Sequence, residues 1–127
     1  MPRDPDITDA FDVFTVVVLR RPADAPDLPE EELDELQARH LAYRAALRRR
    51  GLLVANGPFD LQSDPSYRGM SIFACDPAEA ARLSDGDPSV VAGRLAYDAM
   101  EWWVRAGSLA FPLTEGPVGE RRSMSDD

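Results

Sequence analysis

Residues 30–51 read EEELDELQARHLAYRAALRRRG, and the rest of the chain is arranged around this stretch. Apolar or weakly polar side chains recur at steps of three and four, the spacing that places them on one face of a helix. That face carries Leu33, Leu36, His40, Tyr43 and Leu47. The other positions, Arg44 among them, are mostly charged, and we expect them to form a solvated surface. Gly51 suits the left-handed position that ends a helix.

His40 is the only histidine of the chain, and it stands in the middle of the face that must meet the core. A buried imidazole needs a hydrogen-bond partner, because an unpaired buried polar group costs about 1–3 kcal/mol. The residues alone leave two interpretations open. The imidazole is either a satisfied core histidine or a catalytic or ligand-binding group at the mouth of a cleft.

Length, charge and cysteine content narrow the class of protein. A chain of 127 residues with 44% hydrophobic and 29% charged residues is typical of one soluble globular domain. The net charge of −9 argues against binding to duplex nucleic acid, which needs a basic face. One histidine and one cysteine, Cys75, cannot build the usual zinc site, and no loop has the spacing of a calcium or magnesium site. We therefore expect no metal and no cofactor.

The sequence predicts no association with a membrane. Its first residues are acidic and contain proline, unlike an apolar signal segment, and the longest strongly apolar run, residues 16–19, is far too short to span a bilayer. We expect a cytoplasmic protein with one domain at 11–112, between a flexible N-terminus at 1–10 and a flexible acidic tail at 113–127.

Four further segments have the composition of β-strands. They are rich in β-branched and aromatic residues and are bounded by glycine, proline and aspartate. We predict strands at 11–20, 52–59, 69–75 and 94–105. The first reads as a strand covered on both faces, and the second and third form a hairpin with a long polar loop.

Two segments resemble capping boxes, in which the first residue binds the backbone of the fourth. Residues 27–30 (DLPE) precede the long helix, and residues 76–79 (DPAE) open a short second helix that ends near Gly86. Asp87-Pro88 then begins one more turn of helix, ending near Gly93.

The resulting order, β-α-β-β-α-β, predicts a ferredoxin-like α+β sandwich with both helices on one face of an antiparallel sheet. The other face is left bare. Apolar residues divide between the two faces, namely Val16, Val18, Ile72, Phe73, Trp102 and Trp103. Since an exposed apolar sheet face is unfavourable in water, we expect a homodimer.

Asp87 has two interpretations. It can be a helix cap, as Asp76 of the same Asp-Pro dipeptide is expected to be. Alternatively, because the two helices pack side by side, the loop after the second helix can approach the middle of the first, where His40 stands.

Several short motifs follow one another along the chain. They are His40-Leu41-x-Tyr43, Gly51, Asn56-Gly57-Pro58-Phe59, a strand opened by Gly69, Asp87-Pro88 with Gly93, and Trp102-Trp103. Their order and spacing resemble the YCII-related (YciI-like) family of small dimeric α+β proteins, over roughly residues 14–104. The chain departs from the family in the acidic loop before the long helix and in residues 60–67, so the identity of a substrate is not carried over.

The resemblance implies a ferredoxin-like fold, similar to muconolactone isomerase and related to dimeric α+β barrels, and an active-site pair formed by His40 and Asp87. The family's few assigned activities include a dehydrochlorinase that acts on an aromatic ring. A carboxylate that accepts the Nδ1 proton fixes the imidazole tautomer and leaves Nε2 free to take a proton from a substrate. No base pairs with Ser71 or Cys75 in the sequence, so covalent catalysis is the weaker hypothesis.

We therefore expect a cofactor-independent lyase or isomerase acting on a small cyclic or aromatic molecule, with His40 as general acid/base and Asp87 as its orienting group. The predicted substrate-binding residues are Tyr43, as a hydroxyl donor, and Gly57, Pro58 and Phe59, as the wall. Two alternatives remain: a dimer that binds a small ligand in the same pocket without catalysis, and an accessory protein that works through protein contacts.

Overall fold

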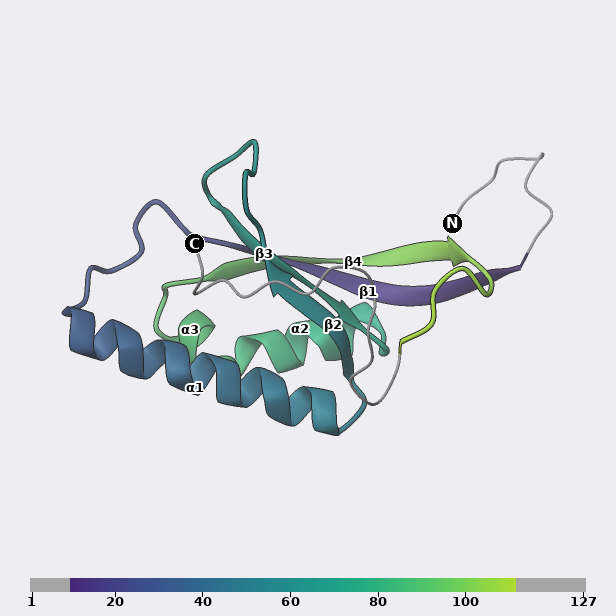
Figure 1. The fold of residues 1–127 in the computed structure, drawn as a ribbon, viewed down its shortest axis with the longest axis horizontal. Coiled ribbons are helices and arrows are strands. Elements are labelled where there is room, and N and C mark those ends of the chain that lie inside the picture. Colours follow the sequence, from purple (N-terminus) through teal and green to yellow (C-terminus); the bar gives the residue numbers. More distant parts are fainter. Residues whose placement is uncertain (1–9, 112–127) are drawn as a thin grey trace.

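The computed structural model describes residues 10–111, in which three helices cover one face of a four-stranded sheet (Figure 1). The elements are β1 (Phe11–Arg20), α1 (Glu30–Arg49), β2 (Leu53–Pro58), β3 (Tyr67–Phe73), α2 (Pro77–Asp85), α3 (Pro88–Val91) and β4 (Ala96–Arg105). The predicted ferredoxin-like β-α-β-β-α-β order is confirmed, with α3 as an additional turn between α2 and β4. The segments predicted to be flexible lie, apart from residue 10, outside the described residues.

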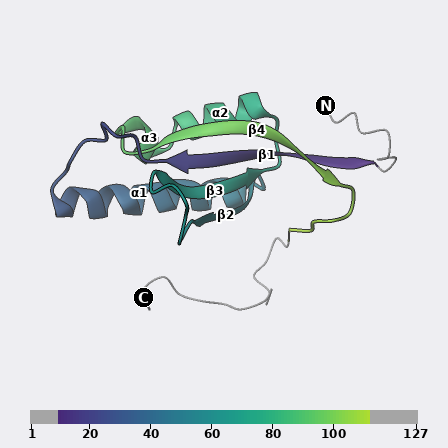
Figure 2. The same cartoon turned by 90° about the horizontal axis from the view of Figure 1, so that it is seen from above.

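The strand order is β2-β3-β1-β4, and every neighbouring pair is antiparallel. β1 is central, so that Val17 lies opposite Ser71 of β3 on one side and Ala99 of β4 on the other. Figures 1 and 2 show α1 below the β2–β3 half of the sheet and α2 below the β1–β4 half. The two helices therefore lie side by side, and α3 follows α2 against α1.

The hydrophobic core lies between the sheet and the helices. Along β1, Thr15, Val17 and Leu19 are buried at alternate positions, as the period of two in a strand requires. The predicted apolar face of α1 is confirmed, because Leu36 and Leu47 are buried and the other three members are partly buried. The buried cluster comprises Val17, Leu19, Leu47, Leu53, Phe73, Ala80, Leu83 and Leu95.

The helix termini confirm one of the two predicted capping boxes. Asp76 caps α2, since its carboxylate accepts a hydrogen bond from the backbone N–H of Glu79 at 2.8 Å. The box predicted at 27–30 is wrong: the N-cap of α1 is Pro29, which has no side-chain acceptor, and Asp27 lies two residues too early. Gly51 has φ +75°, as expected after the end of α1.

Two strands have boundaries that differ from prediction by two residues. β3 covers Tyr67–Phe73 instead of 69–75, and the Thr15 hydroxyl donates to the carbonyl of Cys75 just beyond the strand. β4 starts at Ala96 instead of residue 94, because the N–H groups of residues 94 and 95 both donate to the carbonyl of Ser89 in α3. These two residues close the turn that follows α3 before the strand can begin.

The sheet face away from the helices is open in the monomer. In register it carries Val16, Val18, Met70, Ile72, Met100 and Trp102. Met100 is 45% exposed and Trp102 is 39% exposed, whereas Val16 and Val18 of β1 on the same face are partly buried. Phe73 faces the helices, and Trp103 lies on the helix side of β4 in edge contact with Phe11. Within residues 10–111, no helix combines the length and apolar character needed to cross a bilayer.

Candidate active site

The fold brings His40 of α1 and Asp87 at the start of α3 into direct contact. The imidazole Nδ1 lies 2.9 Å from each carboxylate oxygen of Asp87, although the residues are 47 positions apart. The same carboxylate caps α3, because Oδ1 accepts a hydrogen bond from the N–H of Ser89 at 2.9 Å. The two interpretations of Asp87 are therefore compatible: it caps a helix and it contacts the histidine.

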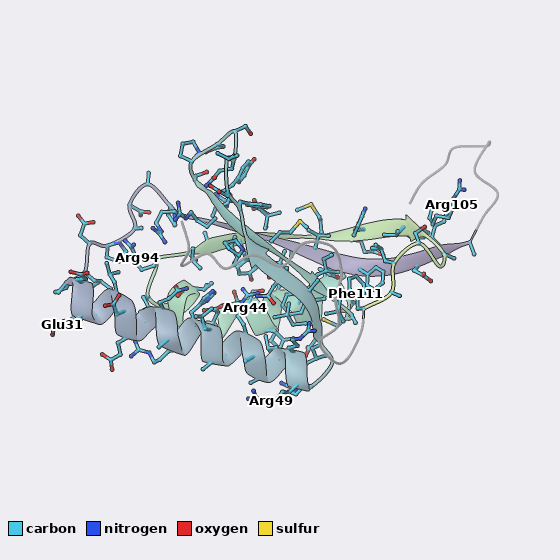
Figure 3. The ribbon with its side chains drawn as sticks, in the orientation of Figure 1. Glu31, Arg44, Arg49, Arg94, Arg105 and Phe111 are labelled. Atoms are coloured by element: carbon cyan, nitrogen blue, oxygen red, sulfur yellow. The ribbon has the colours of Figure 1, made fainter. Side chains whose placement is uncertain are left out.

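Arg44, one helical turn after His40, completes a buried cluster of charges. Its Nε donates to Asp87 Oδ2 at 3.0 Å, and its Nη1 donates to the hydroxyl of Ser71 in β3. The Arg44 side chain is 4% exposed, so its assignment to a solvated surface is wrong. A spacing of four places Arg44 on the same face as His40, and the counter-charge of Asp87 makes its burial tolerable. Figure 3 labels Arg44 near the middle of α1, below the sheet.

The surroundings of Asp87 favour its ionised form. Burial by itself would raise the pKa of Asp87, but hydrogen bonds from His40 and from the N–H of Ser89, with the charges of His40 and Arg44, lower that pKa below its ordinary value. An ionised carboxylate only accepts hydrogen bonds. The contact therefore assigns a proton to His40 Nδ1, and in the neutral imidazole this leaves the lone pair of Nε2 available for a ligand.

A cavity of about 500 Å³ lies beside this cluster, and His40 and Arg44 form part of its wall. α1 supplies one side, and β2 and β3 supply the other. Its apolar lining comes from Leu19, Leu41, Pro58, Met70 and Leu95. A volume of this size accommodates a small organic molecule. The imidazole thus borders a cavity whose wall combines apolar side chains with polar ones, among them Gln37 and Asn56.

The structure gathers some of the predicted binding residues at this cavity and places others outside it. Gly57 and Pro58 belong to its wall. Phe59 instead borders a neighbouring hollow of about 280 Å³, where its ring meets Tyr67 edge-on. The Tyr43 hydroxyl donates to the carbonyl of Leu83 in α2 at 2.7 Å, so its hydrogen is directed into the helix layer.

The two potential nucleophiles lack the surroundings that would activate them. Ser71 accepts a hydrogen bond from Arg44, a residue that cannot act as a base. Burial, together with the charges of Glu79 and Asp76, raises the pKa of the Cys75 thiol and so lowers the population of the reactive thiolate. Among residues 10–111, no group of three or more histidine, cysteine, aspartate or glutamate side chains is placed to hold a metal ion.

Sequence reasoning missed three arginines of the site: Arg44, Arg21 and Arg68, all of which line the cavity. Arg44 had one usable signal, its spacing of four from His40 on an otherwise core-facing stripe. Arg21 follows the last residue of β1, and Arg68 lies in β3, and nothing in their local sequence distinguishes them from other surface arginines.

The chain therefore has the features of a class of small α+β proteins. It is a ferredoxin-like sandwich in which a histidine and an aspartate are paired between the helix layer and a cavity. The model of the YCII-related domain matches residues 14–103, and the chain belongs to that family. The resemblance drawn from the sequence is thereby confirmed.

Comparison with solved structures finds a similar protein in Burkholderia phenoliruptrix, a 5-chloro-2-hydroxyhydroquinone dehydrochlorinase in complex with 2,5-dihydroxybenzoquinone. The two sequences are 21% identical, and the match covers 72% of this chain and 93% of the other with a TM-score of 0.48. The search of curated proteins gives no match.

Proposed function

We propose that this protein is a lyase or isomerase that moves a proton on a small cyclic or aromatic molecule, with His40 as the general acid/base. The observation that carries the proposal is the contact of His40 Nδ1 with both oxygens of a fully buried, ionised Asp87, on the wall of a cavity. A histidine with a purely structural role needs only one hydrogen-bond partner. His40 has a charged partner, Asp87, and its ring also borders a cavity that can hold a ligand.

The reaction follows from the tautomer. Nε2 takes a proton from a carbon or hydroxyl of the bound molecule, and the imidazolium that forms is stabilised by Asp87. The electron pair left on the substrate either forms a double bond as a leaving group departs, which is elimination, or is protonated by Nε2 at a neighbouring atom, which is isomerisation. Asp87 and Arg44 are positioning residues in this scheme, because they act on the substrate only through His40.

Proton transfer can be tested before the substrate is known. The protein is incubated in D₂O with a panel of small hydroxylated and halogenated ring compounds, and deuterium incorporation at carbon is measured by mass spectrometry. We expect exchange with a subset of the panel, and we expect His40→Gln to slow it about 10²–10⁴-fold, the usual contribution of a general base. Exchange that persists in His40→Gln would contradict the proposal. Binding without exchange would favour the alternative of a non-catalytic binding protein.

The single histidine gives a second, spectroscopic test. Its ring nitrogens are observed by long-range ¹H–¹⁵N correlation without overlap from other histidines. We expect the neutral ring to carry its proton on Nδ1 in the wild type and to lose this preference in Asp87→Leu, which offers no acceptor. A neutral ring protonated on Nε2 in the wild type contradicts the assigned role.

We further propose that two copies pair through the open sheet face. The proposal rests on the exposure of Met100 and Trp102 on a continuous apolar surface. Trp102→Glu should convert the dimer to monomer in sedimentation equilibrium at micromolar concentration. Leu61→Glu is the control, since Leu61 is 95% exposed in the loop before β3 and should leave the assembly unchanged. A wild type that sediments only as a monomer refutes this pairing.

A further inference from the structure

The cavity beside His40 has an excess of positive charge. Three arginines line it, Arg21, Arg44 and Arg68, and no aspartate or glutamate does so within residues 10–111. This contrasts with the chain as a whole, whose net charge is −9. The charge of Arg44 is already matched by Asp87, which leaves Arg21 and Arg68 as the arginines of the cavity that have no counter-charge among the described residues.

Within residues 10–111, neither of these two arginines has an acidic partner. Arg21 donates from Nε to the backbone carbonyl of Arg94 at 2.9 Å, and its two Nη groups make no hydrogen bond to the described part of the chain. No side-chain hydrogen bond or ion pair involves Arg68 among the described residues. Elsewhere on the surface arginines do pair with carboxylates, as Arg20 does with Asp98 at 2.8 Å.

The fold also brings these cations close to one another. Burial, followed by the charges of Arg94 and Arg68, lowers the pKa of Arg21. Arg94 is itself held by the carbonyl of Pro26, and Figure 3 shows it towards the N-terminal end of α1. Like charges held together without counter-ions disfavour the empty site, and an anion bound between them removes that penalty.

We propose that the cavity takes a small organic acid, with its carboxylate held by Arg21 and Arg68 and its apolar body against Leu41 and Leu95. A guanidinium pairs with a carboxylate through two parallel hydrogen bonds, which fixes orientation as well as charge. The apolar lining selects a hydrocarbon or ring body over a fully polar one. The proposal that the far end of this acid meets His40 rests on the proposed function; the capture of the carboxylate does not.

A binding role and a structural role predict opposite effects on stability. If Arg68 supports the fold, Arg68→Gln lowers the melting temperature. If it is an anion-binding residue beside another cation, the same change removes repulsion and leaves the melting temperature equal or higher, while affinity falls. The matched control is Arg49→Gln, because Arg49 lies at the C-terminal end of α1 (Figure 3) and does not line the cavity.

The test is titration of the full chain with sodium benzoate and with benzamide, its neutral isostere, followed by NMR at low ionic strength. We expect benzoate to bind at least about tenfold more tightly than benzamide, the difference expected for one charge-assisted interaction. Arg68→Gln and Arg21→Gln should each remove this preference, Arg68→Lys should restore part of it, and Arg49→Gln should leave it unchanged. Equal affinity for the two compounds in the wild type, or an equal loss in Arg49→Gln, overturns the proposal.

His40→Gln separates this inference from the proposed function. It should still bind benzoate, since Arg21 and Arg68 are intact, and it should fail to exchange deuterium. If the wild type prefers benzoate but exchanges nothing, the organic-acid site stands and the proton-transfer function fails. If exchange occurs without any preference for anionic compounds, the proton-transfer function stands and the organic-acid site fails.

Discussion

Replacing Asp87 by asparagine tests whether this residue does more than cap a helix. An asparagine caps a helix about as well as an aspartate, so a cap alone predicts a change near zero. In the structure, however, Oδ1 accepts from Ser89, Oδ2 accepts from Arg44, and both oxygens contact His40 Nδ1. An amide has one oxygen and one NH₂ group, so one of these donors must face another donor.

The charge makes the larger contribution to the expected loss. Asp87 is fully buried and Arg44 is 4% exposed, so the neutral amide leaves the Arg44 guanidinium in the interior without a counter-ion. Removing one partner of a buried ion pair costs about 3–5 kcal/mol. For a domain of this size that corresponds to a fall in melting temperature on the order of 10–20 °C. We therefore expect Asp87→Asn to be strongly destabilising.

The chain supplies its own control for this experiment. Asp76 occupies the same position before a proline, and its carboxylate accepts only from the N–H of Glu79 at an exposed helix start. Asp76→Asn should therefore change the free energy of unfolding, measured by urea denaturation, by less than about 0.5 kcal/mol.

Adding Arg44→Met to Asp87→Asn should recover much of the loss, because the unpaired charge disappears with the arginine. If Asp87→Asn proves as mild as Asp76→Asn, or if the double variant is less stable than the single one, the buried ion pair does not stabilise the site as argued here.

Three further outcomes follow from the same contacts. His40→Leu should keep the free energy of unfolding within about 1 kcal/mol of the wild type in urea denaturation, because Asp87 retains its other donors, and yet abolish deuterium exchange. The pKa of Asp87 is lowered in the folded state, so the ionised carboxylate stabilises the fold at pH values above the ordinary carboxyl pKa. This stabilisation is lost as the pH falls through the lowered pKa of Asp87. Acid denaturation of Asp87→Asn should therefore lack the loss of stability that the wild type shows in this pH range. The hydrogen bond from Tyr97 to Asp85, with burial and the Asp85 charge, raises the pKa of Tyr97 to about 12. Tyr97→Phe should therefore remove a tyrosinate transition at that pH, measured by ultraviolet absorbance. An unchanged titration curve would contradict the contact between Tyr97 and Asp85.

The fold was predictable because its signals are local and periodic. The step of three and four in α1, the β-branched run of β1 and the Asp-Pro dipeptides each act over a few residues, and the order of elements then leaves few topologies. The predictions at 27–30 and at the start of β4 failed for physical reasons: Pro29 occupies the cap position, and residues 94 and 95 bond back to α3.

The site was only partly predictable, because its chemistry depends on contacts between distant residues. The sequence suggested that His40 and Asp87 meet, through the packing of two helices. It gave no indication that Arg44 would be buried, since an arginine between alanine and tyrosine on a charged helix is usually solvated. Arg21 and Arg68 have no carboxylate partner within residues 10–111, and this depends on which residues surround them in space, so patterns along the sequence do not reveal it.

The position of Asp87 at the start of α3 links chemistry to local unfolding. α3 has only four residues, so its position depends largely on the contacts of Asp87 with His40 and Arg44, and a molecule in which α3 opened would no longer hold the carboxylate against the imidazole. Under the proposed function, only the closed fraction of molecules would be competent, and the measured rate would be the intrinsic rate multiplied by that fraction. Substitutions in α3 that never touch a ligand would then change the apparent activity by shifting this population, and a ligand that orders α3 would raise the activity of its own binding site.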